Sequence, residues 1–192
     1  MQHQISNATN YNRYPKIFKE CVKYFKDITP TILSFGCSDG REVLSLHNLY
    51  FKNSNIDGVD ISKDMILKCK ESYVNEKLNF YTSDEFLPKK YDLIFCMSVL
   101  CRWSQTKNVE DCGDIYPFDQ FESQLVMLDE LLNVGGLIVI YNSNFLFTDT
   151  KLSLNYTPLE TEVDESGFVK KFDKNNKHID INYPHTIFIK NK

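Results

Sequence analysis

Apolar runs typical of buried strands alternate with amphipathic helical stretches along most of this chain. The apolar runs lie at 31–36, 55–61, 77–82, 91–100 and 135–143. Helical patterns occupy 41–51, 62–73 and 118–132 between them. Buried strands joined by crossover helices form a parallel sheet, because right-handed crossovers place helices on its faces. The pattern therefore predicts a doubly wound α/β sheet with helices on both faces.

The two ends of the chain depart from this alternation. Residues 14–26 predict a helix whose apolar face carries Ile17, Phe18, Cys21, Val22 and Phe25. After about residue 148, short runs at 167–173, 178–183 and 185–190 surround a turn-like stretch, which favours antiparallel strands. We expect one domain, 1–192, with a helical N-terminal lid (1–29), a ligand-binding core (30–147) and antiparallel C-terminal strands (148–192). The expected sheet is Rossmann-like, seven-stranded and mostly parallel, with an antiparallel C-terminal edge.

Length and charge limit the possible functions. A chain of 192 residues with 42% hydrophobic content suits one core of ordinary size. Its net charge of -4 and pI near 5.6 argue against nucleic-acid binding, which normally needs a basic face. No apolar run approaches the roughly 18 residues of a membrane span, and the polar N-terminus does not resemble a signal peptide. We expect a cytoplasmic protein without a membrane or nucleic-acid partner.

Six cysteines raise the question of disulfides or a metal site. None of them forms a CxxC pair, and several fall inside apolar strand or helix patterns. Buried, reduced thiols are therefore expected, and the sequence shows no metal signature.

The stretch ILSFGCSDGREVLSL, residues 32–46, passes from a strand to a glycine turn and then to a helix. Gly36 and Gly40 bracket the turn, whose backbone N–H groups are expected to point into the crevice above the sheet. Asp60 ends the second strand 20 residues after Gly40 (60 − 40 = 20), where a carboxylate can accept hydrogen bonds from ribose hydroxyls. This combination predicts a ligand that carries a nucleoside.

A dinucleotide is the first alternative, but its GxGxxG pattern is not met. Ser38 and Arg41 stand where the second and third glycines would follow Gly36. Residues 30–147 instead resemble the class I S-adenosylmethionine-dependent methyltransferases, through ILSFGCSDG, IDGVDISKDMI, NFYTSDEFLPKKYDLIFCMSVL and LDELLNVGGLIVIYNSN. Within that superfamily, FGCSDGREVLSL and YDLIFCMSVL are most similar to the chemotaxis-receptor glutamate methyltransferases. Two departures are Ser34, where many members have an acidic residue, and Val134, where proline is usual.

The resemblance implies S-adenosylmethionine as cofactor and S-adenosylhomocysteine as product. Gly36, Cys37 and Ser38 would hold the methionine end, with Gly40 closing the turn, Asp60 on the ribose, Ile61 on an adenine face, Asp84 at the adenine edge, and Cys96 with Met97 as the floor. Each position also has a plainer interpretation. Ile61 and Met97 are ordinary core residues, and Asp84 can simply cap the next segment. Cys37 is not expected to be a nucleophile, because nothing near it in sequence supplies a base.

The acceptor side is predicted from the ends of the fourth and fifth strands, at 101–119 and 141–144. Pocket candidates there are Arg102, Trp103, Tyr116, Tyr141 and Asn144, and the catalytic candidates are Arg102, Tyr141 and His185. Structural roles are about equally expected for these residues. Arg13 or Tyr14 would touch the cofactor if the N-terminal segment were a lid.

The expected reaction is methyl transfer to an oxygen of a small-molecule or glycan-type acceptor. The fourth strand ends in FCMSVL and not in the NPPY-like sequence that aligns exocyclic amines of bases. Methylation of amino groups on DNA is therefore not expected. A non-catalytic module that binds S-adenosylmethionine or S-adenosylhomocysteine is the alternative, and a nicotinamide-dependent enzyme is a further competitor.

Overall fold

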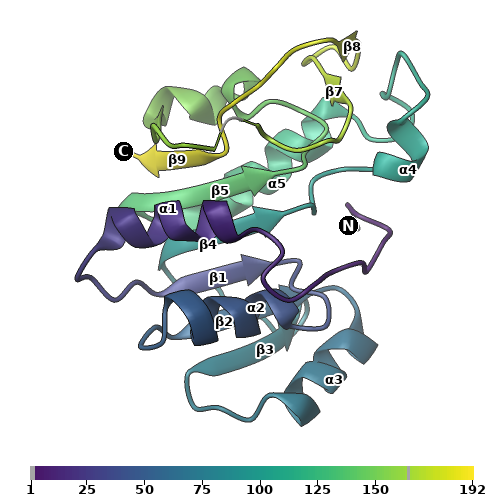
Figure 1. Ribbon diagram of the computed structural model, residues 1–192. Coiled ribbons are helices and arrows are strands. Elements are labelled where there is room, and N and C mark those ends of the chain that lie inside the picture. Colours follow the sequence, from purple (N-terminus) through teal and green to yellow (C-terminus); the bar gives the residue numbers. More distant parts are fainter. Residues whose placement is uncertain (1–2, 164) are drawn as a thin grey trace.

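The computed structural model describes residues 3–163 and 165–192, and within them seven strands form the main sheet in the order β3-β2-β1-β4-β5-β9-β6 (Figure 1). Their bounds are β1 Ile32–Phe35, β2 Ile56–Asp60, β3 Leu78–Thr82, β4 Tyr91–Met97, β5 Leu132–Tyr141, β6 Tyr156–Pro158 and β9 Ile187–Lys190. Strands β1 to β5 pair in parallel, and β9 is antiparallel to both β5 and β6. The predicted Rossmann-like sheet with an antiparallel edge is confirmed.

Helices cover both faces of this sheet (Figure 1). They are α1 Pro15–Phe25, α2 Arg41–Ser45 with its π-helical continuation η1 Leu46–Tyr50, α3 Lys63–Ser72, α4 Trp103–Thr106 and α5 Phe118–Leu131, followed by the 3-10 turns η2 Phe147–Asp149 and η3 Lys151–Asn155. Ser62 caps α3, since its hydroxyl accepts a hydrogen bond from Met65 N.

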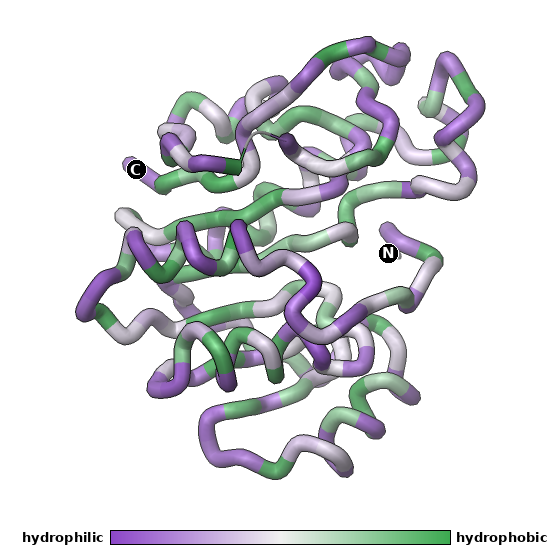
Figure 2. The backbone as a smooth tube through the Cα atoms, viewed as in Figure 1, coloured by the Kyte–Doolittle hydropathy of each residue, from purple (hydrophilic) through white to green (hydrophobic). Residues whose placement is uncertain are grey.

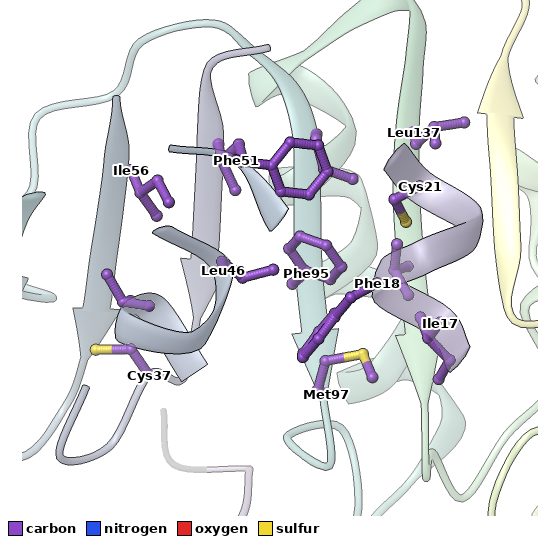
Figure 3. Packing of buried hydrophobic residues seen from close by; sticks show 14 of the residues in the cluster. Ile17, Phe18, Cys21, Cys37, Leu46, Phe51, Ile56, Phe95, Met97 and Leu137 are labelled. Carbon is purple, nitrogen blue, oxygen red and sulfur yellow. The ribbon is translucent and has the colours of Figure 1, made fainter. Parts of the chain in front are cut away.

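Strand alternation divides the core into two layers. On β4, Phe95 and Met97 join the layer under α1, while Ile94 and Cys96 join the layer under α5. Figure 3 shows Phe18 of α1 directed at Phe95 in the first layer, and the two rings meet edge to face at 5.4 Å between centroids. The backbone coloured by hydropathy shows the same arrangement, with the apolar strands inside and the polar helix faces outside (Figure 2). Successive residues of β4 thus serve opposite layers.

The sheet differs from the prediction at its C-terminal edge. Of the three expected runs there, 185–190 supplies β9, while the other two form a separate hairpin of β7 Lys171–Phe172 and β8 His178–Ile179. The outermost strand, β6, was not predicted because Pro158 is unfavourable in a strand, although an edge position tolerates it. Strand β5 also begins directly after α5, at Leu132, which the periodicity had placed in the helix.

All six cysteines are free and buried, as predicted. Burial raises the pKa of the Cys37 thiol well above its ordinary value, which argues against a nucleophilic role. Within 3–163 and 165–192, the helices are all too short or too polar to cross a lipid bilayer.

Candidate functional site

A pocket lies at the carboxyl ends of β1, β2 and β4, where the strand order reverses between β1 and β4. Open α/β sheets bind ligands at this switch point. The pocket has about 840 Å³ of empty space, its open mouth included. The N-terminal segment 3–12, here called the strap, runs along this end of the sheet and supplies part of the pocket wall (Figure 1).

The glycine turn forms one wall of the pocket. Gly36 has φ +78°, and a Cβ built there would lie 2.4 Å from Cγ2 of Val99, so the position requires glycine. The backbone N–H groups of Gly36 and Cys37 donate to Val59 O at 2.7 and 3.0 Å. The expectation that these N–H groups point into the crevice is therefore wrong. They attach the turn to β2 because parallel pairing continues to the end of the strand.

Asp60 ends β2 and lines the pocket. Its Oδ2 accepts a hydrogen bond from Ser38 N at 2.8 Å, and its Oδ1 accepts one from Ser62 N at 2.9 Å. Each carboxylate oxygen can accept a second bond, so Asp60 is positioned by the backbone and still able to bind hydroxyl groups of a ligand.

Glu42 is a pocket residue that the sequence analysis missed. It lies in the first turn of α2, and its Oε1 accepts a hydrogen bond from Ser34 Oγ at 2.8 Å. Burial raises the pKa of Glu42 to about 7, although the Ser34 hydrogen bond and the positive charge of Arg13 both lower it. The replacement of an acidic residue by Ser34 was the available signal, because the helix supplies a carboxylate to the same place.

The remaining predicted cofactor residues separate into two groups. Ile61 and Met97 line the pocket. Gly40 packs behind it, where an added Cβ would lie 2.9 Å from the side chains of Cys69 and Tyr73. Cys96 faces the α5 layer, on the far side of the sheet from Met97. Asp84 points into solvent with its side chain 65% exposed and pairs with Lys63 at 3.1 Å.

Part of the chain is similar to known methyltransferases. Residues 33–115 match the family model of a methyltransferase domain. Over 112 residues the chain is 39% identical to malonyl-[acyl-carrier protein] O-methyltransferase 2 of Ilyobacter polytropus, a stretch that is 56% of this chain and 37% of that protein. The chain thus spans little more than a third of the length of this curated relative. This similarity agrees with the predicted methyltransferase domain and its expected cofactor.

Two solved structures are similar to part of this chain. The plantazolicin methyltransferase BpumL in complex with SAH is 20% identical, with a TM-score of 0.47 over 66% of this chain and 45% of that chain. The PH0226 protein of Pyrococcus horikoshii is 19% identical, with a TM-score of 0.48 over 67% of this chain and 55% of that chain.

The fold brings one of the three catalytic candidates near the pocket. The ring of Tyr141 meets that of Tyr14 at 5.0 Å between centroids, and Tyr14 lines the pocket wall. His185 lies against the ring of Tyr183, after the β8 hairpin. Arg102 N donates to Asn144 Oδ1 at 2.7 Å, so the backbone of Arg102 is fixed to the loop after β5.

The other acceptor-side candidates have packing roles. Trp103 lies on the surface with its ring against Phe168. Tyr116 is fully buried and shares a hydrogen bond of 2.8 Å with His3 Nδ1 of the strap. Asn144 is buried and donates to Thr106 Oγ1 and Lys170 O. The loop 101–119 therefore supports the site from outside, and the structure does not bring Arg102 and His185 together.

Proposed function

We propose that this chain is an S-adenosylmethionine-dependent methyltransferase that methylates an oxygen of a small polar acceptor. The observation that carries the proposal is the position of Asp60, whose carboxylate lies in the switch-point pocket of a methyltransferase domain. Oxygen as the accepting atom is supported by the curated relative, which is named as an O-methyltransferase of a malonyl group on a carrier protein. The acceptor oxygen would belong to a free carboxylate or to a sugar-like hydroxyl.

The chemistry of the pocket fits the cofactor at both of its polar ends. Asp60 would accept hydrogen bonds from the ribose hydroxyls. Glu42 would face the positively charged ammonium of the methionine end, and this contact would favour its ionised form. Ile61 and Met97 add apolar surface for the flat base and the sulfur region. The two carboxylates thus match two features of the ligand that differ in charge.

The residues of this chain have little chemistry to supply, because the bound sulfonium is already an activated methyl donor. Their work is to exclude water and to align the acceptor oxygen with the methyl group. We propose that the strap acts as the lid: Ser38 Oγ donates to Asn7 O at 3.0 Å, directly above the glycine turn. The helix α1 lies on the sheet instead, with Ile17, Phe18, Cys21 and Phe25 buried.

A non-catalytic binding module remains the second candidate, because Arg102 and Trp103 do not converge on the pocket. Calorimetry with S-adenosylhomocysteine, followed by methyl transfer from tritiated S-adenosylmethionine, separates the two. Binding with transfer supports the enzyme, binding without transfer to any oxygen acceptor supports the module, and no binding contradicts both.

A further inference from the structure

A second pocket adjoins the cofactor pocket. It lies between the start of α1 and the end of β5, and its lining includes Arg13, Tyr14, Tyr141, Val163 and Glu165. It has about 600 Å³ of empty space, its open mouth included. Arg13 and Tyr14 line both pockets, so these two side chains form the wall between them.

The backbone next to this wall adopts an unfavourable conformation at two positions. Ser98, directly after β4, has φ +59°, and Asn142, directly after β5, has φ +55°. Non-glycine residues rarely adopt such angles, which cost free energy unless the surroundings hold them. Here Ser98 N donates to Tyr141 O at 2.7 Å and Asn142 N donates to Ser166 O at 2.9 Å. The fold therefore fixes both residues in this conformation.

The side chains of these two residues converge on the hydroxyl of Tyr14. Asn142 Nδ2 donates to Ser98 Oγ at 2.8 Å, and Ser98 Oγ lies 2.8 Å from Tyr14 Oη. The direction of this relay follows from its far end, where Asn142 Oδ1 accepts a hydrogen bond from Phe168 N at 2.9 Å. The amide orientation is then determined, and its NH₂ group faces Ser98.

The relay can leave the Tyr14 proton for a ligand. Ser98 Oγ accepts from Asn142, and either hydroxyl can be the donor in its 2.8 Å contact with Tyr14 Oη; a ligand that needs a donor is met by the arrangement in which Ser98 supplies that proton. The hydrogen of Tyr14 is then available at the wall between the two pockets. A relay that ends in an amide donor cannot carry a proton away, so it suits an oxygen that accepts a hydrogen bond and has no proton to lose.

We propose that the second pocket holds the methyl acceptor and that the Tyr14 hydroxyl donates to its nucleophilic oxygen, which is anionic when it binds. This rests on the proposed function. A carboxylate meets the requirement: a lone pair of one oxygen forms the new O–CH₃ bond, the S–CH₃ bond breaks, and its electron pair stays on sulfur. Anion and sulfonium become a neutral ester and a neutral thioether, and no proton moves.

The charges around the second pocket agree with an anionic acceptor. Arg13 and Lys16 line it, against the single carboxylate of Glu165 among its described lining residues. Tyr141 Oη donates to Glu165 Oε1 at 3.3 Å, so that carboxylate already has a hydrogen-bond partner in the pocket. The guanidinium of Arg13 lies 5.1 Å from the centroid of the Tyr14 ring, so positive charge and the hydroxyl donor belong to the same wall.

The test compares Tyr14→Phe with Tyr24→Phe, which removes a hydroxyl near the opposite end of α1, where Tyr24 Oη donates to Gly135 O. Ser98→Gly is the relay variant, since glycine accepts the positive φ without strain. Malonyl-pantetheine and malonate are the carboxylate probes, and 3-hydroxypropanoyl-pantetheine is the hydroxyl probe. Each variant is titrated with S-adenosylhomocysteine, then the complex with each probe, and transfer of a tritiated methyl group is measured. Alkali releases methanol from a methyl ester but leaves a methyl ether intact.

We expect wild type and Tyr24→Phe to bind and methylate a carboxylate probe with alkali-labile label. Tyr14→Phe should lower kcat and probe affinity at least tenfold and Ser98→Gly severalfold, while S-adenosylhomocysteine binds within threefold. Label on the hydroxyl probe alone, unchanged turnover in Tyr14→Phe, or cofactor binding without binding or methylation of any carboxylate probe would each overturn the inference. Failure of wild type to bind S-adenosylhomocysteine would instead reject the proposed function.

Discussion

The hydroxyl of Ser34 donates a 2.8 Å hydrogen bond to Oε1 of Glu42, which places a carboxylate of α2 at the end of β1. Glu42 is half-buried with a raised pKa, an arrangement that costs stability and is common at functional sites. Removing the charge of Glu42 should therefore change stability and cofactor affinity in opposite directions.

Glu42→Gln should stabilise the ligand-free protein and weaken the binding of the cofactor. Glu42 has a folded pKa of about 7 against an ordinary 4.5, so between these values the native state binds more protons than the unfolded state. Its contribution then falls as pH rises from about 4.5 to 7, by at most about 3 kcal/mol. Urea unfolding at pH 5 and pH 8 should show this slope in wild type and a flatter one in Glu42→Gln.

The same variant should bind S-adenosylhomocysteine about tenfold more weakly at pH 8, since a charge-assisted contact to the ammonium is lost. Calorimetry measures this. A variant that is both less stable at pH 8 and equal in affinity would show that Glu42 is a packing residue.

Asp60→Ala should weaken the binding of S-adenosylhomocysteine at least tenfold. The hydrogen bonds between the Asp60 carboxylate and the ribose are expected to contribute about 1.5 to 3 kcal/mol to the binding free energy. Asp84→Ala is the matched control, as it removes an exposed carboxylate paired with Lys63, and should stay within twofold. Equal affinities for wild type and Asp60→Ala would remove the ribose assignment. Because Asp60 also accepts from Ser38 N and Ser62 N, the melting temperature of each ligand-free variant must be recorded.

Gly36→Ala should destabilise the protein by about 3 kcal/mol or more, through positive φ together with the clash against Val99. Gly135 has nearly the same φ, +80°, with no heavy atom within 4 Å of an added Cβ. Gly135→Ala should therefore cost only about 1 kcal/mol, the conformational part. Denaturant unfolding of both variants gives the difference, and equal losses would show that Val99 moves aside freely.

His3→Ala should release the strap. Its two ring nitrogens lie 2.8 Å from Tyr116 Oη and 2.9 Å from Gln124 Oε1, which attaches the strap to the α5 side of the fold. We expect faster cleavage within 3–12 by a protease and severalfold faster dissociation of S-adenosylhomocysteine in stopped flow. His178→Ala, which removes an exposed contact to Glu110, is the control. Unchanged dissociation in His3→Ala would argue against a lid.

The parallel part of the fold could be predicted because its strands are buried on both faces and appear as continuous apolar runs. The edge could not: β6 is three residues long and contains Pro158, so its pairing with β9 depends on tertiary contact. The exact end of α5 was ambiguous for a related reason, since Leu132 is buried whether it belongs to a helix or a strand.

The sequence predicted those site residues whose position follows from the path of the backbone. It did not predict those whose role depends on the direction of the side chain. Asp60 and Ile61 follow from the end of β2. Cys96 and Met97 could not both face the pocket, because neighbours on a strand point to opposite sides. Arg102 was placed by its distance along the chain, but the positive φ of Ser98 turns the loop away at the end of β4.

Asn12 divides the strap from the wall that the two pockets share. Its N donates to Ser45 Oγ at 2.7 Å, and its Oδ1 accepts from Tyr50 Oη at 2.7 Å, so it is fastened to the α2–η1 segment from two directions. A strap that swings outward would pivot here, breaking the bond from Arg13 Nη1 to Ala8 O and leaving Tyr14 on Ser98. The two pockets would then open independently of each other. The cofactor could be exchanged while Tyr14, in the wall between the pockets, keeps its position.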